Sequence, residues 1–266
     1  MAKVRVIVGM EWAEVFKNRM VFFITAFLPL VIVALPLIML VIFRSVPEAD
    51  LNSMNTGGER VLELFAPLCA DLTETDCLQV YTLSLFLFMF MILPVAIPVT
   101  IAAYSIVGEK TTGSLEPLLA TPITTTELLL GKALAAMTPA ILATWLSYLI
   151  FLVGTRLLVS AAVFSALVDP LWLLAVFIVG PLLALLAVCT SLLISSRVSD
   201  PRAAEQLSAL IVLPLILLVV GQSVGLILIN RQVILLIGLV VAILDIVLVF
   251  LTVRLFERET ILTRWK

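Results

Sequence analysis

Six long apolar stretches restrict the folds open to this chain more than any other feature. They cover roughly residues 20–43, 79–107, 132–154, 171–195, 203–229 and 232–253. An α-helix rises about 1.5 Å per residue, so about 20 apolar residues cross the hydrocarbon core of a bilayer. The sequence therefore predicts an all-α membrane protein with six transmembrane helices, folded as one domain over residues 1–266.

The composition excludes several classes of function. Hydrophobic residues make up 63% of the chain and charged residues 13%, whereas soluble domains have about 45–50% and about 25%. Histidine is absent, which removes His-ligated metal sites and Ser-His or Cys-His catalysis. The sequence also lacks a P-loop motif and a basic block. We therefore expect no catalytic residue, no metal, no bound cofactor and no nucleic-acid partner for this chain.

The lysines and arginines predict the orientation in the lipid membrane. If both termini are cytoplasmic, twelve of the sixteen basic residues lie on the cytoplasmic side. Cytoplasmic loops of membrane proteins carry an excess of Lys and Arg. The sequence therefore predicts an outer loop over residues 44–78 and a cytoplasmic tail over residues 254–266.

The cysteines leave two readings open. Cys69 and Cys77 lie in the acidic outer loop, where an oxidising compartment would allow a disulfide between them. The alternative is two free thiols. Cys189 lies inside the fourth apolar stretch, and we interpret it as a small packing residue.

The first 19 residues predict an amphipathic elbow helix. One side of a helical wheel carries the apolar residues Val4, Val8, Trp12, Val15 and Phe16. Such a helix lies along the membrane with its apolar face at the headgroup boundary. The alternative is a cytoplasmic extension of the first span.

A polar cytoplasmic segment, residues 108–131, separates the second and third spans. Ser114 is a candidate N-cap, and Glu116 in the first turn suits the helix dipole. Leu115, Leu118 and Leu119 would form one apolar face. Pro122 disfavours helix at the residue before it, so the sequence predicts a short helix that ends there.

A second helix start follows directly. Thr124 and Glu127 have the spacing of a capping box, in which each side chain bonds the free backbone N–H of the other residue. The short helix would thus be held crosswise between two spans. Its leucines either form a docking surface for a partner or rest on the membrane surface.

The stretch from Glu109 to Lys132 resembles the cytoplasmic signature of ABC transporter type-2 permeases, the membrane subunits of drug, lipid and sodium exporters. The matching residues are Glu109, Lys110, Gly113, Ser114, Leu115, Glu116, Leu118, Leu119, Thr121, Pro122, Glu127, Gly131 and Lys132. The resemblance implies that this stretch is a coupling helix that sits in a groove of a separate ATP-binding subunit.

The resemblance also implies partners, a bound nucleotide and a translocation path. ATP and Mg would be bound by the partner subunit, and a second permease copy or a paralogue would complete the translocation path. Spans two and five would line that path, and Pro94 and Pro98 would let span two bend between its two states. The expected location is the cytoplasmic membrane of a prokaryote, with both termini in the cytoplasm.

Two regions and two rival functions stay open at this stage. Residues 221–232 form either a tight hairpin or a re-entrant segment. Asp245, a carboxylate deep in the sixth span, either pairs with a Ser or Thr, meets a cation or is protonated, and its role is structural or functional. The rival functions are an ABC permease-like subunit for signalling or envelope assembly, and an intramembrane lipid-modifying enzyme.

Overall fold

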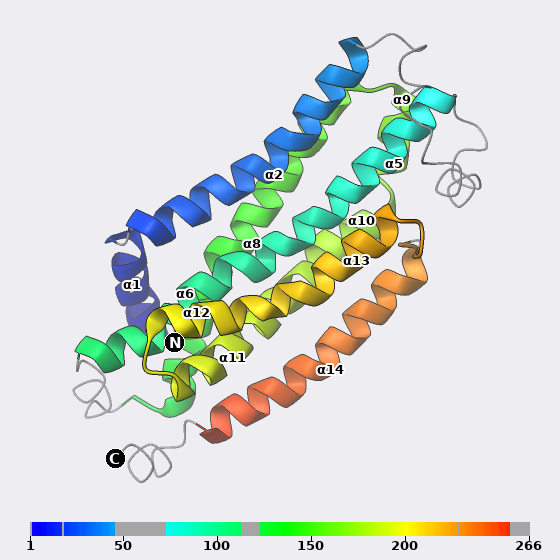
Figure 1. Cartoon of the computed structure of the whole chain (residues 1–266). Helices are drawn as coiled ribbons and strands as arrows, with labels where there is room; N and C mark the ends of the chain where they lie inside the picture. The colour runs from blue at the N-terminus through cyan, green and yellow to red at the C-terminus, as the bar shows by residue number, and fades with distance from the viewer. Residues whose placement is uncertain (1, 18, 46–72, 113–122, 228, 256–266) are drawn as a thin grey trace.

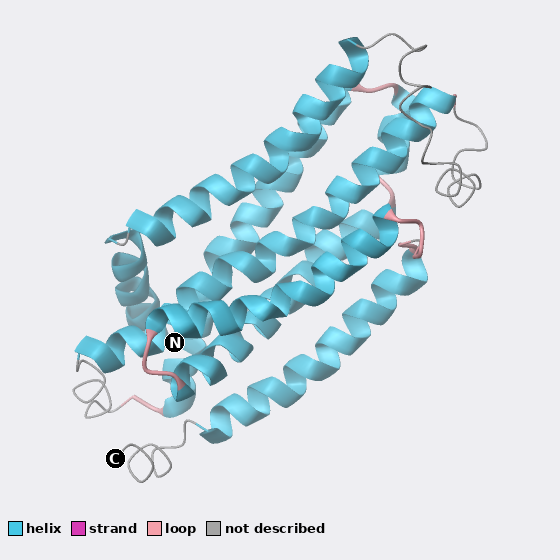
Figure 2. Ribbon diagram, in the orientation of Figure 1, coloured by secondary structure: helices cyan, strands magenta, loops and turns pink. Residues whose placement is uncertain are grey.

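The computed structural model describes residues 2–17, 19–45, 73–112, 123–227 and 229–255. This part of the chain is helical and contains no strand (Figure 2). Its α-helices are α1 (Ala2–Lys17), α2 (Arg19–Ser45), α5 (Glu74–Met89), α6 (Leu93–Thr112), α8 (Thr125–Leu158), α9 (Ala161–Leu167), α10 (Pro170–Leu174), α11 (Gly180–Arg197), α12 (Pro201–Ala209), α13 (Leu213–Ser223) and α14 (Arg231–Leu255).

The six predicted spans are confirmed. The helices that are long and apolar enough to cross a membrane cover Val21–Ile42, Asp76–Ala103, Thr125–Leu158, Ala161–Arg197, Arg202–Ser223 and Arg231–Leu255. They run side by side as an elongated bundle (Figure 1). One end, which we call the α1 end, holds α1, the end of α6, the start of α8 and the α11–α12 turn, and the opposite end is the far end.

Span two lies at the centre of the bundle. The most apolar part of this span is 67% buried, against 17% for spans five and six. Its second helix, α6, which runs toward the α1 end, packs against α11, α8 and α12. The outward faces of α2, α13 and α14 expose large apolar side chains, which suits helices surrounded by lipid. The core therefore forms around α6 and α11.

Three spans change helix type near a proline. The interruptions are the 3₁₀ turns Phe90–Ile92 and Leu210–Val212 and the π turn Ala175–Val179. Each turn ends two residues before a proline, which is Pro94, Pro214 and Pro181, respectively. Proline has no N–H for the carbonyl four residues earlier, and that carbonyl lies inside the interrupting turn in each span. At the first of the two prolines at which span two was expected to bend, the helix is thus interrupted by a 3₁₀ turn.

A short loop joins α13 to α14. Gly225 takes a positive φ of 73°, a conformation that glycine adopts without strain. The backbone N–H of Leu226 donates to the carbonyl of Gly221 at 2.8 Å. Asn230 then accepts a hydrogen bond from the start of α14. Among the described residues of 221–232, the chain passes from α13 to α14 through a short turn that contains no further helix.

Candidate functional site at the α1 end

The predicted capping box is present at the start of α8. The backbone N–H of Thr124 donates to Glu127 Oε2 at 3.0 Å, and the backbone N–H of Glu127 donates to Thr124 Oγ1 at 3.3 Å. Lys3 of α1 lies 3.7 Å from the same carboxylate in an exposed ion pair. The capping box therefore defines where the polar segment ends and α8 begins.

The proposed coupling residues fall mostly outside the described part of the chain. Those outside are Gly113, Ser114, Leu115, Glu116, Leu118, Leu119 and Pro122. Glu109 and Lys110 belong to the last turn of α6. The structure thus fixes the two ends of this segment, at Thr112 and Thr125, and both lie at the α1 end (Figure 1). The coupling role of these residues stays a prediction.

α1 is a separate helix that packs against α8. Its most buried apolar residue, Ile7, is 4% exposed. A Cβ at Gly131 would lie only 2.6 Å from Ile7 Cγ2, so the glycine permits the close approach of the two helices. Trp12 Nε1 also donates to the carbonyl of Ala135 at 3.0 Å. The predicted apolar face of the elbow helix lies beside this contact, and its described members are half-buried.

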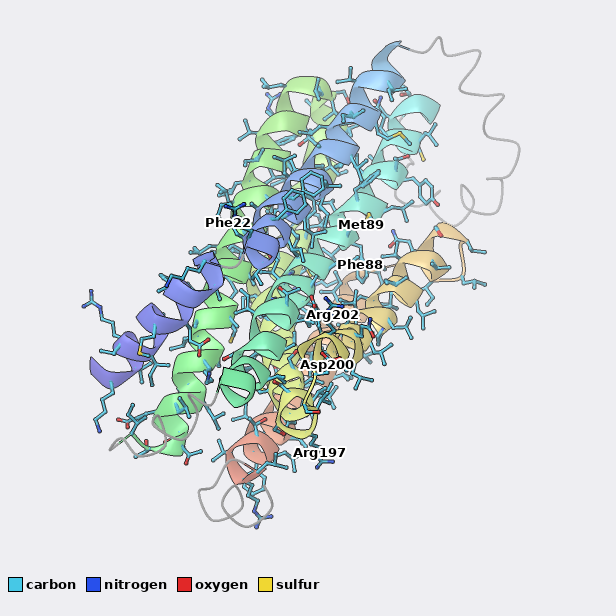
Figure 3. All side chains as sticks on the ribbon, turned by 60° about the vertical axis from the view of Figure 1, so that its left-hand side comes forward. Phe22, Phe88, Met89, Arg197, Asp200 and Arg202 are labelled. Atoms are coloured by element: carbon cyan, nitrogen blue, oxygen red, sulfur yellow. The ribbon has the colours of Figure 1, made fainter. Side chains whose placement is uncertain are left out.

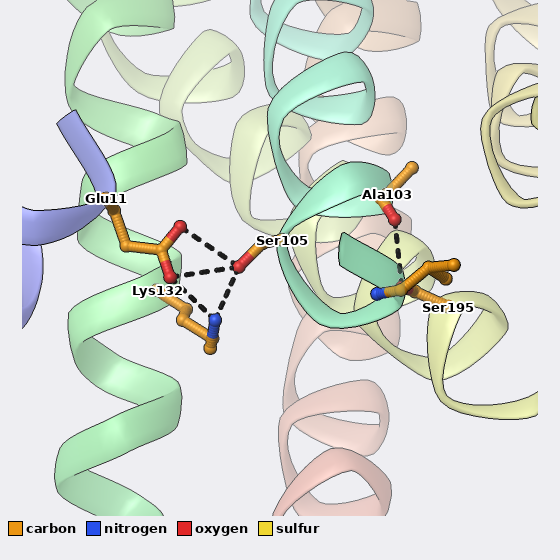
Figure 4. A network of polar contacts seen from close by, with 6 residues as sticks. Glu11, Ala103, Ser105, Lys132 and Ser195 are labelled. Atoms are coloured by element: carbon orange, nitrogen blue, oxygen red, sulfur yellow. Dashed lines mark hydrogen bonds and ion pairs between the residues drawn. The ribbon is translucent and has the colours of Figure 1, made fainter. Parts of the chain in front are cut away.

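Three polar side chains meet where α1, α6 and α8 converge (Figure 4). Lys132 Nζ lies 2.6 Å from Glu11 Oε1 and donates to Ser105 Oγ, also at 2.6 Å. Ser105 in turn donates to the Glu11 carboxylate, 3.1 Å from one oxygen and 3.0 Å from the other. We call this group the Glu11–Ser105–Lys132 cluster.

The cluster is an ion pair removed from water. The side chains of Lys132 and Glu11 are 2% and 10% exposed. Burying two charges costs several kcal/mol per ion, and the attraction between them offsets that cost only with good geometry and further hydrogen bonds. Ser105 supplies such a hydrogen bond to both charges. Each member is therefore costly to remove alone.

Ser195 of α11 inserts its hydroxyl into the backbone of α6 (Figure 4). It donates to the carbonyl of Ala103 at 2.9 Å and accepts from the N–H of Val107 at 3.2 Å. These are the carbonyl and N–H that pair with each other in an ideal α-helix. Ala103 and Val107 also pack with Ala204 of α12. α6 is thus held by α11 and α12 on the side away from α1.

The turn between α11 and α12 adds exposed charges at the same end (Figure 3). Asp200 caps α12 by accepting the backbone N–H of Arg202 at 3.0 Å. Arg197 and Arg202 are both exposed. Charged side chains therefore cover this end of the bundle.

The helix breaks surround a small apolar cavity. It has a volume of about 10 Å³, and its lining includes Phe88 and Met91 of span two, Val179 of span four, Leu215 of span five and Ile234 of span six. A cavity of this size holds about one water molecule. Pro94 begins the helix beside it, and Pro98 lies one turn further on in α6.

Two hydrogen bonds join spans two and five at the far end. Gln222 Nε2 donates to Ser84 Oγ at 3.2 Å, and Tyr81 donates through its hydroxyl to the carbonyl of Ser223, also at 3.2 Å. Gln222 is 1% exposed. The two spans are therefore in contact at the far end.

Asp245 lies in the buried seam of α14 that faces α11. The residue is 4% exposed, and Val241 and Thr252 share its seam. α14 packs against α11, the helix that holds the buried Cys189. Neither carboxylate oxygen has a hydrogen-bond partner among the described residues. Of the three alternatives for Asp245, the hydrogen bond to a Ser or Thr is thus not found in the described part of the chain.

The structure describes two of the three cysteines, Cys77 and Cys189. Cys189 is 4% exposed, in agreement with a packing role. Cys77 is buried at the start of α5, but Cys69 lies outside the described residues, so their disulfide stays a prediction. The described ranges hold no group of three His, Cys, Asp or Glu side chains suited to a metal ion.

Sequence reasoning missed the roles of Glu11, Ser105 and Ser195. The role of Glu11 is indicated by its position, since this acidic residue follows Ile7 by one turn on the buried side of the N-terminal helix. Its basic counterpart, Lys132, stands at the start of an apolar span. Opposite charges at the edges of two apolar helix faces indicate a pair, although they do not say which residues meet.

Six apolar spans define a multi-pass membrane protein. The model of a protein family described as "ABC-2 family transporter protein" matches residues 5–234. The chain therefore belongs to this family. It is therefore a membrane permease subunit of an ABC transporter, whose partner is in general an ABC ATP-binding protein, and is a transport subunit rather than an enzyme. A comparison with curated proteins gives no match.

Proposed function

We propose that this chain forms the translocation path of an ATP-driven exporter, and that a separate ATP-binding subunit drives it through residues 109–122. The observation that supports this most is the position of the segment's two ends. α6 ends and α8 begins at the α1 end, with a capping box at the start of α8. A short helix between two such fixed ends would transmit force better than a free loop.

The charges favour a cytoplasmic α1 end. With both termini in the cytoplasm, twelve of the sixteen lysines and arginines lie on that side, in agreement with the positive-inside rule. ATP and Mg would then be available to a subunit docked on this end. The proposed location is the cytoplasmic membrane of a prokaryote.

Six spans leave little room for a gated path inside one chain, which favours a pair of permeases. The cavity at the helix breaks, of about 10 Å³, would hold about one water molecule and not a substrate. A path for a substrate would therefore form between two copies, or between this chain and a paralogue. Spans two and five would line it, and within this chain the two spans contact each other at the far end.

The proposed cycle follows from this arrangement. ATP binding would bring two ATP-binding subunits together and move the coupling segments that they hold. Span two would bend at Pro94 and Pro98, close to the 3₁₀ turn Phe90–Ile92 that already interrupts its α-helix. ATP shifts such an equilibrium only through contacts that differ between the two states. The leucine face of the coupling segment is our candidate for those contacts.

The test is the double substitution Leu115→Asp with Leu118→Asp. We expect the protein to insert in the membrane and fold, and co-purification of its ATP-binding subunit to fail, because two charges would replace the apolar docking face. The control is Leu115→Met with Leu118→Met, which conserves size and apolarity and should keep the subunit bound. Equal recovery of the subunit with both variants would refute the docking claim.

A further inference from the structure

We propose that Glu11, Ser105 and Lys132 are positioning residues that lock α1 and both helices flanking the coupling segment into one moving body. The inference rests on the proposed function and extends it. It assigns the transmission of force to described residues outside the segment that meets the ATP-binding subunit.

The cluster joins the two flanking helices at the same distance from the segment. Ser105 lies seven residues before Thr112, where α6 ends, and Lys132 lies seven residues after Thr125, where α8 begins. Seven residues of α-helix measure about 10 Å. The cluster thus ties together two arms of equal length, and it holds them against α1 through Glu11. Movement of the segment would therefore turn all three helices together.

The chemistry of the cluster makes this connection stiff. Lys132 is only 2% exposed, so separation of the helices would break its ion pair with Glu11 where water does not readily replace the lost contact. The other ion pair at this end, Lys3–Glu127, is 3.7 Å long with side chains that are 49% and 29% exposed. Water and salt screen such a pair, so it opens freely. Only the buried cluster resists separation in this way among the ion pairs that the structure describes.

The Glu11–Ser105–Lys132 cluster lies on α6, which is part of span two, so movement of the coupling segment would reach span two directly at Ser105. Ser195 is hydrogen-bonded to the carbonyl of Ala103 and to the N–H of Val107. Ser105 lies between those two residues in the same turn of α6. That turn is therefore held by α1 and α8 on one side and by α11 on the other. A rotation of the locked body would pass to spans two and four.

The experiment uses the complex of the full chain with its ATP-binding subunit, purified in detergent. Two quantities are measured for each variant: the amount of ATP-binding subunit retained, and the change in hydrogen–deuterium exchange of the far-end loop around Val224–Ile227 when ATP and Mg with vanadate are added. The variants are Glu11→Gln and the neutral pair Glu11→Gln with Lys132→Met. The matched control is Lys3→Ala, which breaks the exposed ion pair.

We expect Glu11→Gln to retain the ATP-binding subunit and to lose the nucleotide-dependent change at the far end, while Lys3→Ala keeps both. If Glu11→Gln fails to fold, the neutral pair decides, because it leaves no buried charge behind. A folded neutral pair that lacks the nucleotide response supports positioning. A folded neutral pair or Glu11→Gln protein with the parent's full response overturns it. Loss of the ATP-binding subunit from the parent complex would instead contradict the proposed function.

Discussion

Lys132→Met tests how much the buried ion pair contributes to stability. Methionine keeps most of the length of the lysine side chain and removes only its charge and donors, so the change isolates the ammonium. Glu11 would then be left buried, with Ser105 as the remaining partner of its carboxylate among the described contacts.

The magnitude follows from the geometry. Two unit charges 2.6 Å apart attract each other by about 6 kcal/mol at an effective dielectric constant of 20. Desolvation of the two ions costs several kcal/mol each, so the net contribution of the intact pair is small. Removal of one partner leaves the other uncompensated, which costs about 3–5 kcal/mol. The neutral pair Glu11→Gln with Lys132→Met should cost far less, about 1 kcal/mol, because neither charge remains.

The assay is the thermal unfolding of the detergent-solubilised protein. At about 2–4 °C per kcal/mol, Lys132→Met should lower the unfolding temperature by about 10 °C. The neutral pair should recover most of that loss. Lys3→Ala should change the temperature by about 3 °C or less, because its ion pair is exposed. The reasoning is refuted if the neutral pair is as unstable as Lys132→Met, or if Lys132→Met behaves like Lys3→Ala.

Two further substitutions test packing inside the bundle. Gly154→Ala places a Cβ 2.6 Å from Leu37 Cδ2, so we expect a loss of about 1–3 kcal/mol from overpacking between α8 and α2. The same change in a Leu37→Ala background should cost less, and equal costs in the two backgrounds, measured by thermal unfolding, would show that the contact is absent. Asp245→Asn should leave the unfolding temperature within about 4 °C, because the carboxylate has no hydrogen-bond partner to lose among the described residues. A fall of 10 °C or so would mean that the carboxylate is bound to a partner.

Local patterns in the sequence predicted local structure well. Thr124 and Glu127 stand three residues apart, so the capping box depends only on one turn of chain. The six spans follow from uninterrupted apolar runs in the same way. The short helix α9 was missed, although Ser160 caps it by accepting the N–H of Val163, because its seven apolar and small residues resemble a continuation of the spans around it.

Contacts between residues far apart in the sequence could not be predicted from local patterns. Glu11 and Lys132 are 121 residues apart, and no periodicity within one helix indicates which charge faces which. Ser105 and Ser195 resemble ordinary small residues of apolar helices, and their roles depend on which backbone passes beside them. The prolines indicated that span two would break, and Pro181 accounts for the position of the π turn in span four in the same way. The contacts of Phe177 in that turn with Trp145 and Tyr148, by contrast, depend on how two spans pack together.

The separation of Glu11 from Lys132 also has a consequence for biogenesis. During synthesis, α1 emerges well before span three, and its buried acid has no basic partner until residue 132 has been made. The contacts of α1 with α8, including the ion pair of Glu11, can therefore form only after the third span has been made. Docking of α1 then marks the point at which spans one to three have assembled in the right order. A chain whose third span inserted in the wrong direction would leave Glu11 exposed, and quality-control proteases would have a means of telling the two products apart.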